Sequence, residues 1–192
     1  MKGDRCLSPK CAIIKKPYAP GEKPKKRKRG ISEYGKELSE KQKLKNWYNL
    51  REKQFSNYVK DVLAKRSKKE NTATLLIRKL ENRLDNVIFR LGFCSSRKQS
   101  RQLVNHGHFL VNNRRVDIPS YQVKKGDIIS IRPAGKEKPF FKNIISILEK
   151  HQTPSWIKFN AKKLEAEIIG QPSLEEAMPP AEVSAIFEFY SK

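Results

Sequence analysis

The sequence predicts an α+β fold, in which helical segments lead into a compact module of two short helices and a small antiparallel sheet. Two observations support this prediction. Apolar residues recur at intervals of three and four between residues 34 and 91, as on one face of a helix. After Gly107 the interval changes to two, with Phe109 and Val111 alternating with their neighbours, as in a strand.

The N-terminal segment, residues 1–30, is expected to be extended and basic. Residues 15–30, KKPYAPGEKPKKRKRG, combine prolines with a run of like charges, which repel one another and oppose compact structure. Two interpretations stay open for this run: a solvated tail, or a segment that becomes ordered on RNA phosphates. Its cations are Lys25, Lys26, Arg27, Lys28 and Arg29.

Residues 34–48 and 55–63 predict a helical hairpin that turns near Asn49, and residues 75–80 predict a third helix. The aromatic residues on the apolar stripes are expected to pack in a core rather than to stack on bases. Lys41, Lys43 and Lys45 lie off the stripe and should face solvent or RNA.

The module follows at residues 82–131. Its first helix runs from Leu84 and is closed by Gly92, and Ser96 with Gln99 forms a capping box that opens the second helix. The long donors of the second helix should project away from its buried stripe and face RNA. Asn112 and Asn113 predict a tight primed turn, because asparagine tolerates positive φ.

Beyond Arg132 the prediction is a loop, a short helix at about 141–150, strands at 156–159 and 164–169, an irregular segment at 171–180 and a terminal apolar run at 186–190.

The charge balance indicates a polyanionic partner. Lys and Arg total 42 against 20 Asp and Glu, which gives a formal net charge of +22. Such an excess attracts nucleic acid or an anionic membrane. No apolar run approaches the roughly 18 residues that a membrane helix needs, and no charged-then-apolar leader precedes Gly3. We therefore expect a cytoplasmic protein without a membrane partner.

The cysteines predict neither a disulfide framework nor a complete metal site. There are three, Cys6, Cys11 and Cys94, an odd number. Cys6 and Cys11 resemble half of a zinc knuckle, but a structural zinc needs about four ligands. Five residues precede Cys6, which leaves no upstream pair, so we expect no zinc and no other cofactor.

Four blocks of the sequence resemble one family. RLDNVIFRLGF, SRKQSRQLVNHGHFLVNNRRVDIPSY and VKKGD are similar to the αL RNA-binding module of the bacterial-type small-subunit ribosomal protein S4 family. GDRCLSPKCA, SEKQKLKNWYNLREKQFSNYV and IFEFYSK are similar to other parts of that family, in the same order. The αL module alone also occurs in RNA-modifying enzymes and a tRNA synthetase, so it is the collinear set that carries the resemblance.

The resemblance implies a domain arrangement. It has a helical domain over 31–80 that is completed by 170–192, an inserted RNA-binding domain over 81–169 with the αL module at 82–131, and the basic segment over 1–30 with the remnant half of a zinc knuckle.

The resemblance also implies a function as a structural protein of the small ribosomal subunit. Family members bind a helical junction in the 5′ domain of small-subunit rRNA early in assembly, contribute to translational accuracy, and line the channel through which messenger RNA enters. They also contact a neighbouring ribosomal protein, and Ile186, Phe187 and Tyr190 are candidates for that contact or for the core that supports it. An organelle ribosome stays possible.

The residues expected to contact RNA are the basic and polar side chains of these segments. They are Lys25, Lys26, Arg27, Lys28, Arg29, Lys43, Lys45, Arg83, Arg90, Arg97, Lys98, Arg101, Gln102, His106, Asn112, Arg114, Arg115 and Tyr121.

Parts of the sequence also suggest two other function classes. Arg83, Leu84 and Asp85 form a triplet that also surrounds the catalytic aspartate of some pseudouridine synthases, but the 61 residues after Ile131 are too few for their catalytic domain. We expect Asp85 to fix a helix terminus or to pair with an arginine. No nucleotide-binding glycine fingerprint is present, so no small-molecule substrate is expected. A free stress factor that rescues stalled ribosomes would not need the blocks GDRCLSPKC and SEKQKLKNWY.

Overall fold

The structure is a computed structural model of the chain, and it describes residues 8–18, 21, 30–65, 71–136, 141, 148, 151–160 and 163–191. The expected basic run at 25–29, Cys6 and most of the expected helix at 141–150 lie outside the described residues. The helices of the described chain are α2 (Ala12–Lys15), α3 (Glu33–Trp47), α4 (Glu52–Ala64), α5 (Thr72–Glu81), α6 (Leu84–Arg90), α7 (Arg97–Asn105), α8 (Pro133–Lys136), α10 (Leu174–Ala177) and α11 (Val183–Ser191). The strands are β1 (Phe109–Val111), β2 (Arg114–Arg115), β3 (Ile128–Ile131), β4 (Ile157–Asn160) and β5 (Glu165–Ile168).

The helical hairpin predicted around Asn49 is confirmed. Helix α3 begins after Ser32, whose hydroxyl accepts a hydrogen bond from the Gly35 backbone N–H at 3.2 Å. Asn49 adopts φ 53°, a left-handed conformation in which asparagine is tolerated, and α4 begins three residues later. The apolar stripe of α4 is buried at Phe55, Val59 and Val62.

The predicted start of the second module helix is also confirmed. The Ser96 hydroxyl accepts a hydrogen bond from the Gln99 backbone N–H at 3.3 Å, which caps α7. Gly107, just after α7, adopts φ +66°. A Cβ added there would lie 2.3 Å from Arg115 Nε, at the end of an exposed side chain that can move aside, so it is chiefly the backbone conformation that favours glycine.

The sheet is antiparallel throughout, with strand order β2-β1-β3-β5-β4. Asn112 and Asn113 connect β1 and β2 with φ values of 49° and 62°, which is the predicted primed turn. The predicted strands near 156–159 and 164–169 form the hairpin β4–β5, and β5 pairs with β3.

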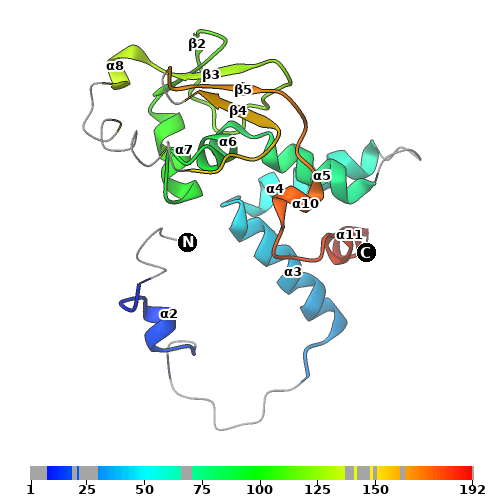
Figure 1. Cartoon of the computed structure of the whole chain (residues 1–192). Helices are drawn as coiled ribbons and strands as arrows, with labels where there is room; N and C mark the ends of the chain where they lie inside the picture. The colour runs from blue at the N-terminus through cyan, green and yellow to red at the C-terminus, as the bar shows by residue number, and fades with distance from the viewer. Residues whose placement is uncertain are drawn as a thin grey trace.

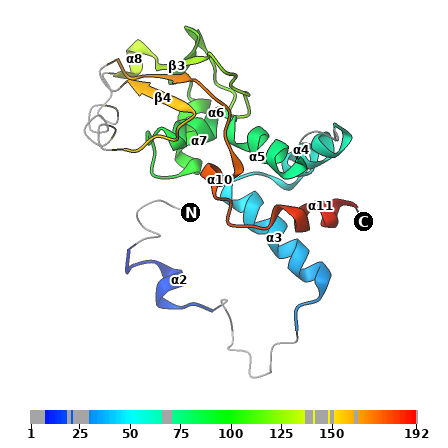
Figure 2. The same ribbon diagram turned by 45° about the vertical axis from the view of Figure 1, so that its right-hand side comes forward.

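Two hydrophobic cores organise the described chain. The module core lies between α6, α7 and the sheet, and the helical core lies among α3, α4, α5 and α11. Figures 1 and 2 show α11 alongside α3, far from it in the sequence, and α11 packs more closely against α3 than against α4. The docking of the last residues onto the N-terminal helices, implied by the resemblance, is therefore present, and the α+β fold class is confirmed.

Several sequence expectations were wrong. The expected loop beyond Arg132 contains the short helix α8 at Pro133–Lys136. The segment at 171–180 is not wholly irregular, because Ser173 caps the short helix α10 by accepting from the Glu176 backbone N–H at 3.2 Å. Lys41 does not face solvent: it is buried, pairs with Glu52 at 2.8 Å and lies 4.3 Å from the ring centroid of Phe189. The aromatic rings of α11 cover it.

Within the described residues, no helix is both long enough and apolar enough to span a bilayer.

Candidate RNA-binding surface

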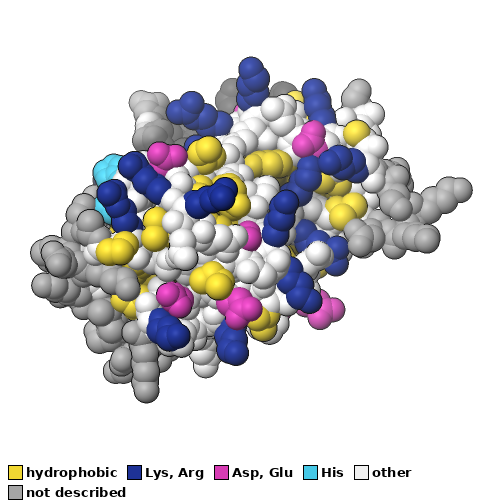
Figure 3. All heavy atoms as spheres, turned by 90° about the horizontal axis from the view of Figure 1, so that it is seen from above, with side chains coloured by type: hydrophobic (Ala, Val, Ile, Leu, Met, Phe, Trp, Pro, Cys, Tyr) yellow, Lys and Arg dark blue, Asp and Glu magenta, His cyan; other side chains and the backbone are white. Residues whose placement is uncertain are grey.

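The exposed donors of α7 and the β1–β2 hairpin form one surface. Lys98, Gln102 and His106 are exposed along α7, and Arg101 is half-buried beside them. Arg114 and Arg115 are exposed on β2. Because the Arg115 guanidinium lies over Gly107, the hairpin tip continues the α7 surface. Figure 3 shows Lys and Arg side chains spread across the face seen from above, with Asp and Glu side chains between them.

The Asn112 side chain makes hydrogen bonds that hold the β1–β2 turn against the segment before β3. Its Nδ2 donates to Asp127 Oδ1 at 2.8 Å, and its Oδ1 accepts from the Ile128 backbone N–H at 2.9 Å. Asp127 in turn accepts from the Lys124 backbone N–H at 2.8 Å. These bonds place the turn with the exposed Lys124 and Lys125 beside the hairpin, so both lysines join the candidate surface. Neither lysine was among the residues expected to contact RNA, although both stand in the VKKGD block that resembles the family.

Three arginines that were expected to contact RNA make their contacts within the protein. Each guanidinium of Arg83, Arg90 and Arg97 is engaged with protein groups; Arg83 and Arg97 are buried and Arg90 is partly buried, so the expectation that Arg97 projects from the outer face of α7 was wrong. A buried charge is costly unless it is paired. Arg83 and Arg90 pair with carboxylates, whereas Arg97 lies against aromatic rings.

Arg83 is 1% exposed and pairs with Asp85, with Nη2 to Oδ2 at 2.8 Å and Nε to Oδ1 at 3.1 Å. Its Nη1 donates to the Tyr58 hydroxyl at 2.6 Å. Burial raises the pKa of Asp85, which the charge of Arg83 only partly offsets. The prediction that Asp85 pairs with a nearby arginine is confirmed, and this carboxylate is not open to a substrate.

Arg90 pairs with the buried Glu81 through two parallel hydrogen bonds of 2.9 and 2.8 Å. Glu81 also accepts from the Tyr48 hydroxyl at 2.6 Å and from Asn86 Nδ2 at 2.7 Å. Burial, followed by the charge of Glu81, raises the pKa of Tyr48 well above its ordinary value. Arg90 Nη2 also donates to the Ala177 carbonyl at 3.0 Å, which ties α6 to α10.

Arg97 is 9% exposed and lies among aromatic rings. Its guanidinium carbon is 4.7, 5.0 and 4.5 Å from the ring centroids of Trp47, Tyr48 and Phe89. Its Nε donates to Asn86 Oδ1 at 2.8 Å. Helical periodicity placed Arg97 on the outer face of α7, but the end of α3 covers that part of the helix.

The expected contacts on the helical domain are in ion pairs. Lys43 pairs with Glu40, and Lys45 with Glu52 at 3.1 Å. Tyr121 is half-buried against the module core, and its carbonyl accepts from the Leu84 backbone N–H at 2.9 Å. Their RNA contacts stay predictions.

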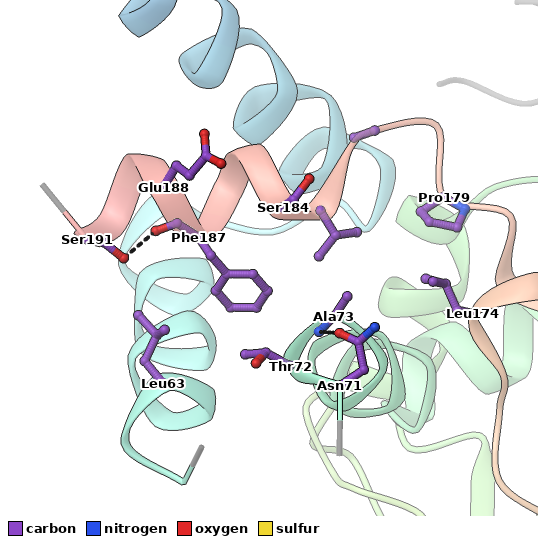
Figure 4. Close-up of a pocket in the computed structure, with 12 residues that line it drawn as sticks. Leu63, Asn71, Thr72, Ala73, Leu174, Pro179, Ser184, Phe187, Glu188 and Ser191 are labelled. Atoms are coloured by element: carbon purple, nitrogen blue, oxygen red, sulfur yellow. Dashed lines mark hydrogen bonds between the residues drawn. The ribbon is translucent and has the colours of Figure 1, made fainter. Parts of the chain in front are cut away.

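The three candidates for a protein contact occupy different positions on α11. Ile186 is fully buried in the helical core. Tyr190 donates its hydroxyl hydrogen to Glu52 Oε1 at 2.9 Å. Phe187 lines a groove of about 570 Å³ between α4, α5 and α11, together with Leu63, Thr72 and Leu174 (Figure 4). Ile186 thus belongs to the helical core, and a protein contact at Phe187 stays a prediction.

The described residues hold no group of three or more His, Cys, Asp or Glu side chains arranged for a metal ion. His106 and His108 lie with ring centroids 6.0 Å apart, and His108 also stacks edge-on to Phe141. Burial raises the pKa of Cys94 to about 12, which keeps that thiol protonated.

Comparison with known proteins gives two family models that together match most of the chain. The model described as the S4 domain matches residues 82–129, and the model described as the ribosomal protein S4/S9 N-terminal domain matches residues 1–81. Proteins named small ribosomal subunit protein uS4 from Kosmotoga olearia and Pelotomaculum thermopropionicum are each 44% identical over all 192 residues, covering 90% of the relative. The uS4 protein of Thermodesulfovibrio yellowstonii is 43% identical with the same coverage.

The chain belongs to the ribosomal protein S4 family. In this S4-family chain the two matched models meet at residues 81 and 82, between α5 and α6. That junction is where Glu81, Arg83, Asp85 and Arg90 form their buried ion pairs. The connection between the two matched regions is therefore fixed by charge as well as by packing.

Proposed function

We propose that this chain is a structural component of the small ribosomal subunit and binds small-subunit rRNA directly. The observation that carries the proposal is the likeness to uS4 proteins over the full length of the chain. The exposed cations of α7 and the hairpin support direct RNA binding. A non-catalytic role is supported by the burial of Asp85, the candidate catalytic residue, in an ion pair.

The surface suits recognition of RNA shape. Side chains cannot read the deep, narrow major groove of A-form RNA, so proteins contact its phosphates and 2′-hydroxyls instead. Arg101, Arg114 and Arg115 would bind phosphates on successive backbone segments. Gln102 and His106, exposed between them, can donate and accept hydrogen bonds with ribose hydroxyls.

The finer parts of the proposal follow the family resemblance. The RNA would be a helical junction in the 5′ domain, bound early in subunit assembly, and the protein would contribute to translational accuracy. The basic segment at 25–29 would contact messenger RNA near the channel where it enters. The groove at Phe187 would receive a neighbouring ribosomal protein. We propose neither zinc nor another cofactor, and no small-molecule substrate.

The test is binding of the full chain to a 5′-domain rRNA fragment and to an unrelated RNA duplex across a salt series. The variant is Arg101→Gln with Arg114→Gln, and the charge-matched control is Lys158→Gln with Lys163→Gln, two exposed lysines at the β4–β5 hairpin. Each lost phosphate contact lowers the slope of log affinity against log salt by about 0.7–0.9.

We expect the wild type to prefer the fragment, the Arg101/Arg114 variant to lose that preference with a slope smaller by roughly 1.4–1.8, and the control to behave as wild type. Equal binding of both RNAs by the wild type would reduce the function to nonspecific binding of polyanions.

A further inference from the structure

The buried polar network between the two cores contains more positive than negative charge. Arg83 pairs with Asp85 and Arg90 pairs with Glu81, each at 2.8 Å. Arg97 is the third arginine of this network, and within the described part of the chain no carboxylate lies at ion-pairing distance from it. Its Nη2 is buried and has no hydrogen-bond partner. The network therefore carries one uncompensated positive charge, on Arg97.

This charge persists at neutral pH. Burial lowers the pKa of Arg97 to about 10, so the guanidinium stays protonated. The faces of Trp47, Tyr48 and Phe89 stabilise the cation in part. Aromatic rings carry no net charge, however, and leave the buried cation without a counter-ion.

A cavity of about 260 Å³ opens beside Arg97, between the turn that follows α3 and the turn that precedes α7. Its polar lining consists of side chains that can donate hydrogen bonds, and none of the described residues that line it is acidic. The donors include Asn46 and Asn49 on one side and Ser95, Ser96 and Lys98 on the other. Trp47 also lines the cavity, and its Nε1 is buried without a hydrogen-bond partner.

The N-terminus of the nine-residue helix α7 borders the same cavity. The Ser96 hydroxyl accepts a hydrogen bond from the Gln99 N–H. The N–H groups of Arg97 and Lys98 belong to the first turn of the helix and have no acceptor within it. The positive end of the helix dipole also attracts negative charge, and helix N-termini of this kind bind phosphate groups. The N-terminus of α7, the buried guanidinium of Arg97 and the hydrogen-bond donors that line the cavity therefore all favour binding of an anion.

We propose that this cavity holds one phosphate group of a bound RNA backbone, whose negative charge is the missing counter-ion of Arg97. This rests on the proposed function, because Lys98 at the cavity also belongs to the α7 surface. Lys98, Ser95 and the α7 N–H groups contact the phosphate, and Arg97 acts from behind through its charge, since its Nη2 is covered. The RNA backbone then lies at the seam of the two cores and holds them together.

The first experiment observes the indole N–H signals of the ¹⁵N-labelled full chain by NMR. The chain has two tryptophans: Trp47 lines the cavity, and Trp156 lies in the module core and serves as the internal control. The titrants are the 5′-domain rRNA fragment and, separately, inorganic phosphate against chloride at equal ionic strength. We expect the RNA fragment to shift the Trp47 signal while the Trp156 signal stays in place.

A shift of Trp47 with inorganic phosphate but none with RNA would show a site for a free anion and overturn the RNA assignment. No shift with either titrant would overturn the site altogether. RNA binding that keeps its preference for the fragment while Trp47 is unmoved would leave the proposed function standing and remove only this site.

The second experiment compares Lys98→Gln with Lys158→Gln, an equal charge change at an exposed lysine of β4. Loss of one charge-assisted phosphate contact should weaken RNA binding by about tenfold and lower the salt slope by about one. Lys158→Gln should leave both unchanged, and the Trp47 shift should vanish in Lys98→Gln alone. Equal behaviour of the two variants would contradict the proposal.

Discussion

Replacing Glu81 by Gln should destabilise the fold more than any surface change of equal charge. Glu81 is 1% exposed and accepts hydrogen bonds from Arg90, Tyr48 and Asn86. A glutamine keeps the shape but removes the charge, so Arg90 loses its counter-ion and one former acceptor oxygen becomes an NH₂ group facing other donors. The charge imbalance that already exists at Arg97 then grows.

The magnitude follows from the burial of the pair. Breaking a buried ion pair by removing one partner costs about 3–5 kcal/mol, out of a total stability of roughly 5–15 kcal/mol for a native protein. For a chain of this size each kcal/mol moves the melting temperature by about 2–4 °C, so we expect a fall of roughly 6–20 °C.

The same residue predicts a pH dependence. Burial alone would raise the pKa of Glu81, but the hydrogen bonds and charge of Arg90, with Tyr48 and Asn86, lower it below 4.5. A carboxyl whose pKa is lower in the folded state stabilises the fold above its unfolded pKa, and this contribution is lost as the pH falls through the folded pKa. The difference between wild type and Glu81→Gln should therefore be full at pH 7 and shrink below about pH 4.5.

The assay is equilibrium urea unfolding of the full chain, followed by circular dichroism at several pH values. The control is Glu167→Gln, an exposed glutamate on β5 with the same charge change, for which we expect a change within about 0.5 kcal/mol. An unfolding free energy of Glu81→Gln within that same margin would refute the view that the Glu81 network fixes the junction of the two cores.

Three more outcomes are expected. Gly107→Ala and Gly126→Ala both force a non-glycine residue to positive φ, at +66° and +89°, and each should cost about 1–2 kcal/mol in urea unfolding. Gly107→Ala should also weaken rRNA binding, because its Cβ displaces Arg115, whereas Gly126 has open space around it; equal RNA affinities of the two variants would contradict this. Burial raises the pKa of Glu52, but hydrogen bonds from Lys41, Tyr190 and Lys45 outweigh it and lower that pKa to about 2. The stabilisation that Glu52 gives α11 is thus present above about pH 4.5 and lost as the pH falls toward 2, so proteolysis in the Glu52→Gln variant should release α11 faster at pH 7, and unchanged cleavage would be the contrary result. Elemental analysis of the purified chain should find well below one zinc per molecule, since the N-terminal segment has two cysteines where a structural site needs about four ligands; a full equivalent would overturn this.

The sequence by itself determined the local structure and the family. Turn and cap residues act over a few positions, so Asn49, Ser96 and the Asn112–Asn113 pair could be assigned from the chain alone, and the structure confirms each of them. The change from helical to strand periodicity predicted the order of elements for the same reason. The collinear blocks alone indicated the S4 family.

Tertiary structure decided which charged side chains are free to meet RNA. Helical periodicity distinguishes the faces of one helix, but it does not show what packs against each face. Helical periodicity predicts that Arg97 is an exposed cation. The end of α3, some fifty residues earlier in the chain, nevertheless covers it with Trp47 and Tyr48. Arg90 and Glu81 are likewise joined across α5 and α6, and Lys41 is covered by α11. Burial of a charge depends on contacts between distant segments, and only the folded chain brings those segments together.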